Sequence, residues 1–440
     1  MPRALSFLGK AFLAAALAIG VRAYPVNAQN VDTTRGVRIG LTYTPGTRPG
    51  VLVLPVEGEH GDSIRAILQR DLDFGDRVTV VALEITALDS LSDGSRNRFN
   101  FPLYARLGAA AVVRASSAPY GLRVAVFDVA KQAQARVKDF ALDGEPLSSQ
   151  WRLSLHSVAD ELEEWITGVR GIAATRILFT SGGRVWRVDS DGANATPLTP
   201  AEGAMSPAWH PKATHFVYTR MTDVGTQVVL REIGGPARVV SGEPQTVNAT
   251  PVFSPDGNTI LFAHGFDRGT DLYAASAFGS EPIRRVTVGR GTDNISPSFS
   301  PDGRRIVFTS NRPGHLELYV SDADGTNAEP LTPFNFGDQN YRSNPDWSPD
   351  GRLVAFQAQF EGRFQIVTIN PRDRSMKRYT NEGVNEDPSW APDSRHLVFT
   401  SNRSGSSQLW VLDIETNRVR QLTRLPQGAR GGAWSPRLVQ

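Results

Sequence analysis

The sequence contains no cysteine, which excludes disulfide bonds, thiolate metal sites and a cysteine nucleophile. It also lacks an excess of charge of one sign, because 47 lysines and arginines face 45 aspartates and glutamates, a formal net charge of +2. That balance gives no electrostatic sign of a nucleic-acid binder. What is present is a 440-residue chain of ordinary globular composition, 40% hydrophobic and 21% charged, and longer than a single domain usually is.

Basic residues and a short apolar run at the start of the sequence indicate an export signal. The run from Ala11 to Val21 is too short for a permanent membrane-spanning helix, and small residues follow it at Ala23 and Ala28. We expect residues 1–28 to be removed by cleavage after Ala28, with Ala23 as the alternative position. The product should be an exported, soluble protein.

A short pattern recurs six times in the second part of the chain, and an aromatic residue marks its period. The aromatic residues are Trp209, Phe253, Phe299, Trp347, Trp390 and Trp434. Their spacing of 43 to 48 residues fits the four-stranded blades of a β-propeller. Three copies continue with Ser-Pro-Asp-Gly, a tight turn in which proline sets φ and glycine takes the conformation that follows. An apolar strand such as Ile306-Val-Phe-Thr comes next in each unit.

The two ends of this array are out of phase with each other. The first unit begins at its second strand, Arg176-Ile-Leu-Phe-Thr, whereas Ala433-Trp-Ser-Pro436 has no strand after it. The late strand should therefore complete the first blade and cover edges that an open array would expose. We predict a six-bladed all-β propeller over residues 172–440 that is closed by its C-terminal strand.

A smaller α/β domain is predicted before the ring, at residues 51–171, after an extended arm at residues 29–50. An apolar strand at Val51–Val56, a helix at Asp62–Phe74 capped by Asp62 and Ser63, and a strand at Arg77–Leu83 imply a parallel strand pair. The remaining predicted elements are a helix at Leu103–Leu107, a strand at Ala110–Arg114, a hairpin of Leu122–Val129 with Ala135–Phe140, and a helix at Trp151–Val169.

The sequence, with its arm, α/β domain and propeller in this order, resembles the TolB family over essentially the whole chain. The members of this family are the periplasmic components of the Tol-Pal envelope system. The segments that carry the resemblance are Val37-Arg-Ile-Gly-Leu41, Leu107-Gly-Ala-Ala-Ala-Val-Val113, Ile166-Thr-Gly-Val-Arg-Gly171 with Thr175-Arg-Ile177, and Ala433-Trp-Ser-Pro436. The resemblance implies a non-catalytic, periplasmic, monomeric scaffold that maintains outer-membrane integrity and invagination during cell division. Its implied partners are the peptidoglycan-associated lipoprotein Pal and the C-terminal domain of TolA, with other outer-membrane proteins a further possibility.

The loop before each Pro-x-aromatic recurs once per blade, and such loops should converge on one mouth of the ring. The resemblance implies a Pal-binding rim of Val247, Asn248, Ala249, Thr250, Asp293, Asn294, Ile295, Ser296, Arg342, Ser343, Asn344, Asn385, Glu386 and Asp387. Val247 stands where better-known members have histidine, and Ser296 where they have glutamate, so the individual contacts there are open. The alternative is that these loops only connect the blades.

The arm carries an alternating strand pattern in which Val37, Ile39 and Leu41 alternate with Arg38 and Gly40. A segment this short cannot form a sheet alone, but it can add to the edge of another protein's sheet. The resemblance names TolA as the protein that accepts it. The alternative is that the arm packs on its own domain, and whether its occupancy is coupled to Pal binding is open.

Catalytic and metal-binding motifs are the remaining question. The sequence has no Gly-x-Ser-x-Gly and no phosphate-binding glycine loop, and its seven histidines are dispersed. Segments at Asp189 and Asp322 resemble the start of a calcium loop but have proline at the twelfth position. We expect no catalytic residue, metal or cofactor. The alternative function, an enzyme acting on envelope glycan or peptide, needs converging acids, and Glu386 with Asp387 is the adjacent acid pair on the rim loops.

Overall fold

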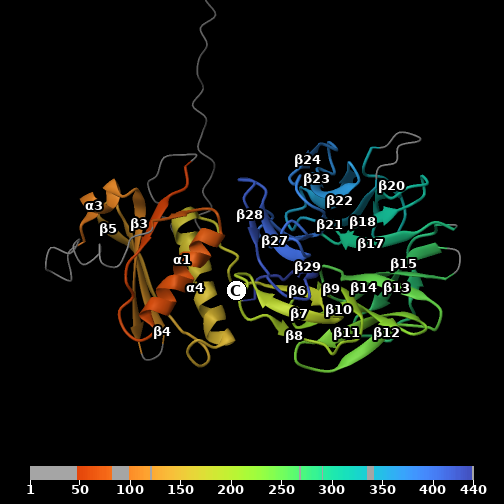
Figure 1. The fold of residues 1–440 in the computed structure, drawn as a ribbon, viewed down its shortest axis with the longest axis horizontal. Helices are drawn as coiled ribbons and strands as arrows, with labels where there is room; N and C mark the ends of the chain where they lie inside the picture. Colours follow the sequence, from red (N-terminus) through yellow and green to blue (C-terminus); the bar gives the residue numbers. More distant parts are fainter. Residues whose placement is uncertain are drawn as a thin grey trace, which may run out of the picture. The chain divides into compact units, whose positions relative to one another are not determined.

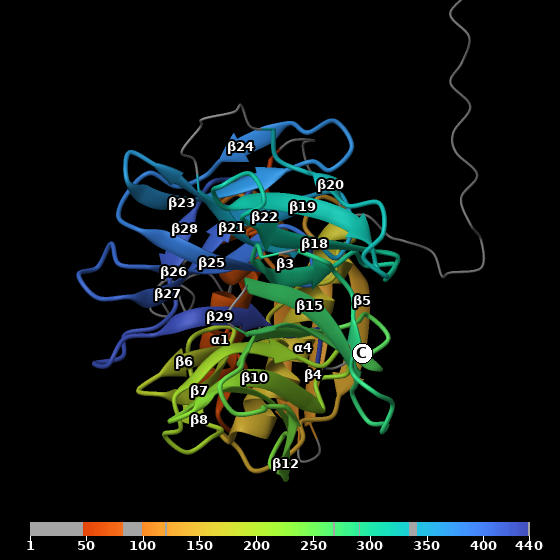
Figure 2. The same ribbon diagram turned by 90° about the vertical axis from the view of Figure 1, so that its right-hand side faces the viewer.

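The computed structural model describes residues 47–81, 99–118, 121–266, 269–289, 291–333 and 341–438, which fall in one compact unit. The predicted signal peptide and the arm residues 37–41 lie outside the described residues. Figures 1 and 2 show the ribbon from two directions, with the α/β domain in red to yellow and the six successive sheets in yellow-green to blue.

The α/β domain is built on one five-stranded sheet in the order β2-β1-β3-β4-β5. Its strands are β1 (Gly50–Val53), β2 (Thr79–Val80), β3 (Ala109–Ala118), β4 (Gly121–Asp128) and β5 (Ala133–Phe140). Strand β1 is parallel to β2 and β3, while β3, β4 and β5 form an antiparallel meander. The predicted parallel pair and hairpin are therefore confirmed, with shorter strands at β1 and β2.

Helices α1 (Gly61–Phe74) and α4 (Ser149–Thr167) lie side by side on one face of this sheet, and α3 (Phe101–Arg106) contributes to the core on the other face (Figure 1). The two faces follow from the strand period of two, since Ala111 and Val113 of β3 pack toward α1 and α4 while Val112 packs on the opposite side.

The cap predicted for α1 is wrong. The helix begins one residue earlier, after His60 in a left-handed conformation, and no side chain caps it. A Cβ on Gly61 would lie 2.1 Å from the carbonyl oxygen of Val56, so the tight approach of these two segments fixes where the helix starts. By contrast, Ser148 caps α4 as an N-cap serine should, because its hydroxyl accepts a hydrogen bond from the Trp151 amide.

The propeller has six four-stranded antiparallel sheets, numbered here as blades 1 to 6 and given from the inner strand outward. Blade 1 is β29 (Arg430–Trp434), β6 (Arg176–Ser181), β7 (Arg184–Asp189) and β8 (Thr196–Pro197). Blade 2 is β9 (Ala204–Trp209), β10 (His215–Thr222), β11 (Gly225–Glu232) and β12 (Ala237–Ser241). Blade 3 is β13 (Val247–Phe253), β14 (Thr259–Phe266), β15 (Gly269–Ser276) and β16 (Arg284–Arg285).

The remaining three blades repeat the same order. Blade 4 is β17 (Asn294–Phe299), β18 (Arg305–Ser310), β19 (Glu317–Asp322) and β20 (Glu329–Pro330). Blade 5 is β21 (Arg342–Trp347), β22 (Val354–Phe360), β23 (Arg363–Ile369) and β24 (Met376–Arg378). Blade 6 is β25 (Asn385–Trp390), β26 (His396–Ser401), β27 (Gln408–Asp413) and β28 (Val419–Gln421).

The last strand closes the ring as predicted. Strand β29 pairs antiparallel with β6, so that Trp434 lies opposite Ile177. The Trp434 side chain is only 6% exposed, its indole Nε1 donates to the Thr175 hydroxyl at 2.8 Å, and its ring contacts Phe74 of α1. One residue therefore joins blade 1, the linker before it and the α/β domain.

Replacing Trp434 with alanine should lower the free energy of unfolding by roughly 3 to 5 kcal/mol, because the change removes a buried aromatic group and leaves a cavity. Urea unfolding of the two proteins measures the difference. Met376→Ala is the control, since Met376 is 44% exposed and its loss should cost less than about 0.5 kcal/mol. Equal midpoints for Trp434→Ala and the parent would contradict closure by β29.

Candidate functional site

The four predicted rim segments all lie at the mouth of the propeller. Strands β13, β17, β21 and β25 begin at Val247, Asn294, Arg342 and Asn385. Because neighbouring strands are antiparallel, the loops that enter each inner strand and the hairpins between the second and third strands share one face. The Ser-Pro-Asp-Gly turns and the hairpins between the third and fourth strands share the opposite face.

Each inner strand carries a β-bulge at the same point, directly before its proline or, in blade 1, before Gly432. The bulged residues have positive φ: Ser206 (47°), Thr250 (49°), Ser296 (50°), Asn344 (52°), Asp387 (52°) and Gly431 (61°). A left-handed conformation costs an L-residue roughly 1 to 2 kcal/mol, so its occurrence in every blade requires compensation.

Hydrogen bonds from the preceding blade supply that compensation. Bulge amides donate to side-chain oxygens as follows: Thr250 to Thr219 (3.2 Å), Ser296 to Thr250 (3.0 Å), Asn344 to Thr309 (3.2 Å), Asp387 to Gln357 (2.9 Å) and Gly431 to Thr400 (3.0 Å). Five of the six bulges are thus fixed by the blade before them, and these bonds also hold neighbouring blades in register.

The bulges surround a cavity of about 370 Å³, which we call the funnel. Its lining includes Ser206, Thr250, Ser296, Asn344, Asp387, Arg430 and Gly431, together with the prolines that follow the bulges. Of the predicted rim residues, Thr250, Ser296, Asn344 and Asp387 therefore meet at one site. The prediction missed Ser206, Arg430 and Gly431, although the repeat copies Ser206-Pro-Ala-Trp and Gly432-Ala-Trp could have located them.

The funnel wall is a polar hydrogen-bonded chain on one side. The Ser296 hydroxyl donates to the side-chain Oδ1 of Asn344 at 2.9 Å, and the side-chain Nδ2 of Asn344 donates to the Asp387 carboxylate at 2.6 Å. Burial raises the pKa of Asp387, although the hydrogen bond from Asn344 acts to lower it. Burial and the neighbouring Asp387 also raise the pKa of Glu386, which does not line the funnel. The two acids do not converge on the cavity in the way that acid catalysis requires.

A second carboxylate lies deeper along the funnel. Asp346 accepts hydrogen bonds from the Ser298 hydroxyl at 3.2 Å and from the Trp390 amide at 2.8 Å. Burial raises its pKa to about 6, even though these bonds favour the charged form. Both carboxylates are therefore tied to neighbouring blades.

Other predicted rim residues hold the loops in place. Asn248, Asn294 and Asn385 are fully buried, and the side-chain Nδ2 of each donates to a group of the preceding blade. Arg342 binds the buried Glu317 at 3.0 Å, and Asp293 accepts a hydrogen bond from the Thr270 amide at 3.1 Å. Ser343 is buried and bonds to Gln357, while Ala249 and Ile295 are partly exposed. Only the residues that line the funnel and the exposed side chains of the rim are therefore accessible to a partner.

Exposed apolar side chains gather at the mouth ends of blades 2 and 3. We call Met205, Met221, Val224, Val247 and Phe266 the apolar arc. Met205 and Val247 lie at the starts of β9 and β13, and the other three lie at the hairpins that share that face. The two blades are joined there, because the Gln245 amide donates to the carbonyl oxygen of Val224 at 2.6 Å.

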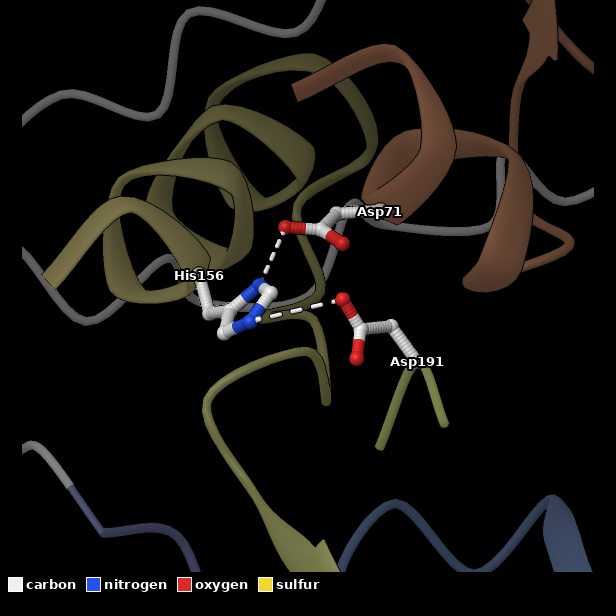
Figure 3. Close-up of side chains that lie close together, drawn as sticks. All are labelled: Asp71, His156 and Asp191. Atoms are coloured by element: carbon white, nitrogen blue, oxygen red, sulfur yellow. Dashed lines mark hydrogen bonds and ion pairs between the residues drawn. The ribbon is translucent and has the colours of Figure 1, made fainter. Parts of the chain in front are cut away.

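Two clusters of histidine and carboxylate lie where the α/β domain meets the propeller: Asp71, His156 and Asp191 (Figure 3), and Asp76, His396 and Asp413. In the first, the two carboxylates face opposite nitrogens of the His156 ring, at 2.6 Å and 3.7 Å. Arg70 and Arg152 already bind Asp191, so a metal ion would compete with two guanidinium groups. The chemistry of these groups fits ion pairs and does not fit a metal centre. Sequence reasoning missed both clusters.

The acidic hairpins that resemble calcium loops are closed by their own hydrogen bonds. The Asp322 carboxylate accepts a hydrogen bond from the side-chain Nδ2 of Asn327 at 2.6 Å, and the Asp324 carboxylate accepts one from the Thr326 hydroxyl at 2.6 Å. The Asp189 carboxylate accepts one from the side-chain Nδ2 of Asn194 at 2.6 Å. These bonds are those of hairpin turns, so a turn accounts for the acidic residues in both segments. Among the described residues, no helix is both long and apolar enough to cross a membrane.

The bulge geometry predicts a difference between two substitutions at Gly431. A Cβ there would meet no atom within 4 Å, so backbone strain alone should decide the cost. Gly431→Val should lower the free energy of unfolding by roughly 1 to 2 kcal/mol, and Gly431→Asn by clearly less, because asparagine tolerates the left-handed conformation. Chemical denaturation measures both. Equal losses for the two variants would contradict the assigned conformation.

Comparison with known proteins gives the family. The family model described as "TolB beta propeller domain" matches residues 163–438. The Tol-Pal system protein TolB of Albidiferax ferrireducens is 30% identical over 214 residues, which cover 46% of this chain and 47% of the relative. That of Bordetella parapertussis is 28% identical over 267 residues, which cover 58% and 59%. The chain thus spans about half the length of the curated relatives that it matches.

A solved structure supports the same architecture. The crystal structure of TolB from Acinetobacter baumannii matches with a TM-score of 0.76 at 21% identity, over 89% of this chain and 98% of that chain. At this identity the likeness shows the fold, here an α/β region followed by a six-bladed propeller that its last strand closes. The family model covers well over half of the sequence, and the chain belongs to the TolB family of Tol-Pal system proteins.

Proposed function

We propose that this chain is a non-catalytic periplasmic scaffold of the Tol-Pal system, which binds a Pal-type lipoprotein at the funnel and the C-terminal domain of TolA through its arm. In this role it supports outer-membrane integrity and invagination during division. The observation that carries the proposal is the funnel, to which all six blades contribute and whose four predicted residues meet at one mouth. Family membership supplies the class of partner.

The surface chemistry of the mouth suits a protein partner. The apolar arc offers five exposed apolar side chains at the mouth ends of blades 2 and 3, and apolar surface beside polar residues is typical of protein interfaces. Beside it the funnel offers hydroxyl, amide and carboxylate groups that can accept or donate hydrogen bonds. A partner loop that inserts into the funnel would contact both kinds of surface.

The α/β domain leaves the mouth open. Its ion pairs go to the opposite ends of the blades: Arg77 binds Asp393 in the turn after β25 at 3.1 Å, and Arg70 binds Asp191 in the hairpin after β7. Two partners could therefore bind through separate regions of the chain.

The alternative function, an enzyme acting on glycan or peptide, has less support from the geometry. It needs two acids that are free to act on a substrate in the cavity. Glu386 does not line the funnel, and the two acids that do are engaged, Asp387 by Asn344, and Asp346 by Ser298 and Trp390. Binding is the function that the arrangement of these groups supports best.

Substitutions at the mouth should weaken capture of the lipoprotein while the fold remains intact. Ser296→Arg, which fills the funnel, and Val247→Asp, which places charge in the apolar arc, should each weaken binding at least about tenfold, as loss of a central interface contact does. Calorimetry with the soluble domain of the lipoprotein measures this.

Asp324→Lys is the matched control, because Asp324 is exposed in a hairpin on the opposite face. It should bind like the parent protein, and circular dichroism should show that all three variants are folded. Equal weakening by the control would place the binding site elsewhere.

Deletion of residues 29–42 should abolish capture of the TolA C-terminal domain and leave capture of the lipoprotein unchanged. The reason is that the alternating segment Val37–Leu41 can add a strand to a partner's sheet, while the funnel is formed by other residues. Pull-down with each purified partner tests both parts. Undiminished TolA capture by the truncated chain would rule out the arm as its binding segment.

A further inference from the structure

Two fully buried histidines lie between the α/β domain and the propeller, and each lies between carboxylates of both domains. His156 of α4 has Nδ1 at 2.6 Å from Asp71 of α1, in its own domain. Its Nε2 faces Asp191 of the propeller hairpin after β7, at 3.7 Å (Figure 3).

The second histidine repeats this arrangement from the other side. His396 belongs to β26 of the propeller, and its Nδ1 lies 2.8 Å from Asp393 in its own domain. Its Nε2 faces Asp76, which follows α1 in the α/β domain, at 3.6 Å. In each case the nearer carboxylate is in the same domain and the farther one is across the boundary.

This geometry favours the protonated form of both rings. A neutral imidazole carries one N–H, so one of its nitrogens would present a lone pair to a buried carboxylate. An imidazolium donates toward both carboxylates. Burial lowers the pKa of each histidine, but the charges and hydrogen bonds of Asp71 at His156, and of Asp393 at His396, outweigh burial and raise it.

We propose that His156 and His396 form a pH-sensitive clasp, which holds the α/β domain on the propeller while both rings are protonated and loosens as they lose their protons. The inference concerns the contact between the domains and is independent of which partners bind.

The charged groups around the clasp determine its direction. Asp189 also faces His156, and Arg70 and Arg152 bind Asp191. The further acids around His396 are Asp413 and Glu163. Four arginines bind the acids of this cluster: Arg77 binds Glu163, Arg395 binds Asp413, and Arg418 and Arg420 bind Asp76. The arginines keep their charge throughout the relevant range.

The sign of the pH dependence follows from the raised values. Each histidine stabilises the closed contact fully below its unfolded pKa of about 6.5, and this contribution is lost as pH rises through the higher folded pKa. Burial raises the pKa of Glu163 to about 7, so its ionisation also works against the closed contact as pH rises. Burial is outweighed at both Asp393 and Asp413, whose pKa values are lowered, by the charge of His396 at Asp393 and by hydrogen bonds from Arg395 and Thr416 at Asp413. Both acids stay charged throughout.

Amide hydrogen exchange on the mature chain between pH 6 and pH 9, corrected for intrinsic rates, tests the clasp. The reporter segments are the end of α1 with the following turn, residues 72–77, and the linker at residues 168–172. Ala173 and Ala174 are left out because their amides donate to Asp160, whose pKa burial raises to about 7. Their opening equilibrium should rise with pH over this range, and a tenfold rise would correspond to about one unit of raised pKa summed over the two rings. Amides in β18 of blade 4 are the internal reference and should not respond.

The double variant His156→Gln and His396→Gln should show open exchange in the reporter segments, with a pH response no larger than the ionisation of Glu163 produces. His215→Gln is the matched control, because His215 lies in blade 2, outside both clusters, and its Nδ1 bonds to the neighbouring Thr214 hydroxyl. This variant should behave like the parent. Exchange that stays constant in the parent, or a pH response of parental size in the double variant, would overturn the proposal.

A measurement on the unmodified protein tests the proposal even if the variants fail to fold. Nitrogen-15 spectra of the imidazoles should show two buried rings that are protonated at both nitrogens at pH 6.5. Neutral rings at that pH would also overturn the proposal, and this result would leave lipoprotein capture at the mouth untouched as a separate question.

Discussion

A propeller holds its shape only as a closed ring, and in this chain closure depends on the antiparallel pair of β29 with β6. That pair places Trp434 against Thr175 and Phe74, so it also fixes where the α/β domain meets blade 1. At its other end it brings Gly431 into the ring of bulges that forms the funnel. The mouth of the propeller and the contact between the domains therefore depend on the same strand.

The funnel shows how a repeated backbone can carry different chemistry. Every blade supplies a left-handed residue at the same point, and the amide is satisfied by the blade before it in the cases of Thr250, Asn344 and Gly431. The side chains at these positions remain small and polar, or absent, because larger branched groups are strained there. The shape of the funnel is thus a property of the fold, and its hydrogen-bonding pattern is a property of this sequence.

Much of the fold could be predicted because its signals are local. The aromatic period and the Ser-Pro-Asp-Gly turns define the blades, and the out-of-phase ends predict closure. The start of α1 could not be predicted, because the close approach of Gly61 to Val56 is a tertiary contact. The histidine clusters were hidden for the same reason, since His156 is 85 residues from Asp71 along the chain. At the mouth, the repeat locates the loops but cannot tell Thr250, which lines the funnel, from the buried Asn248.

The closing strand has a consequence for the order in which the molecule is made. Strand β29 follows every other strand of the ring along the chain, and Trp434 lies 259 residues after its partner Thr175. Contacts of such long sequence separation form slowly, because much chain must be ordered before they yield any stabilisation. Until they form, β6 has an unpaired edge that can pair with other chains. Closure of the ring is therefore a late step in folding, and it is the step at which aggregation competes with folding.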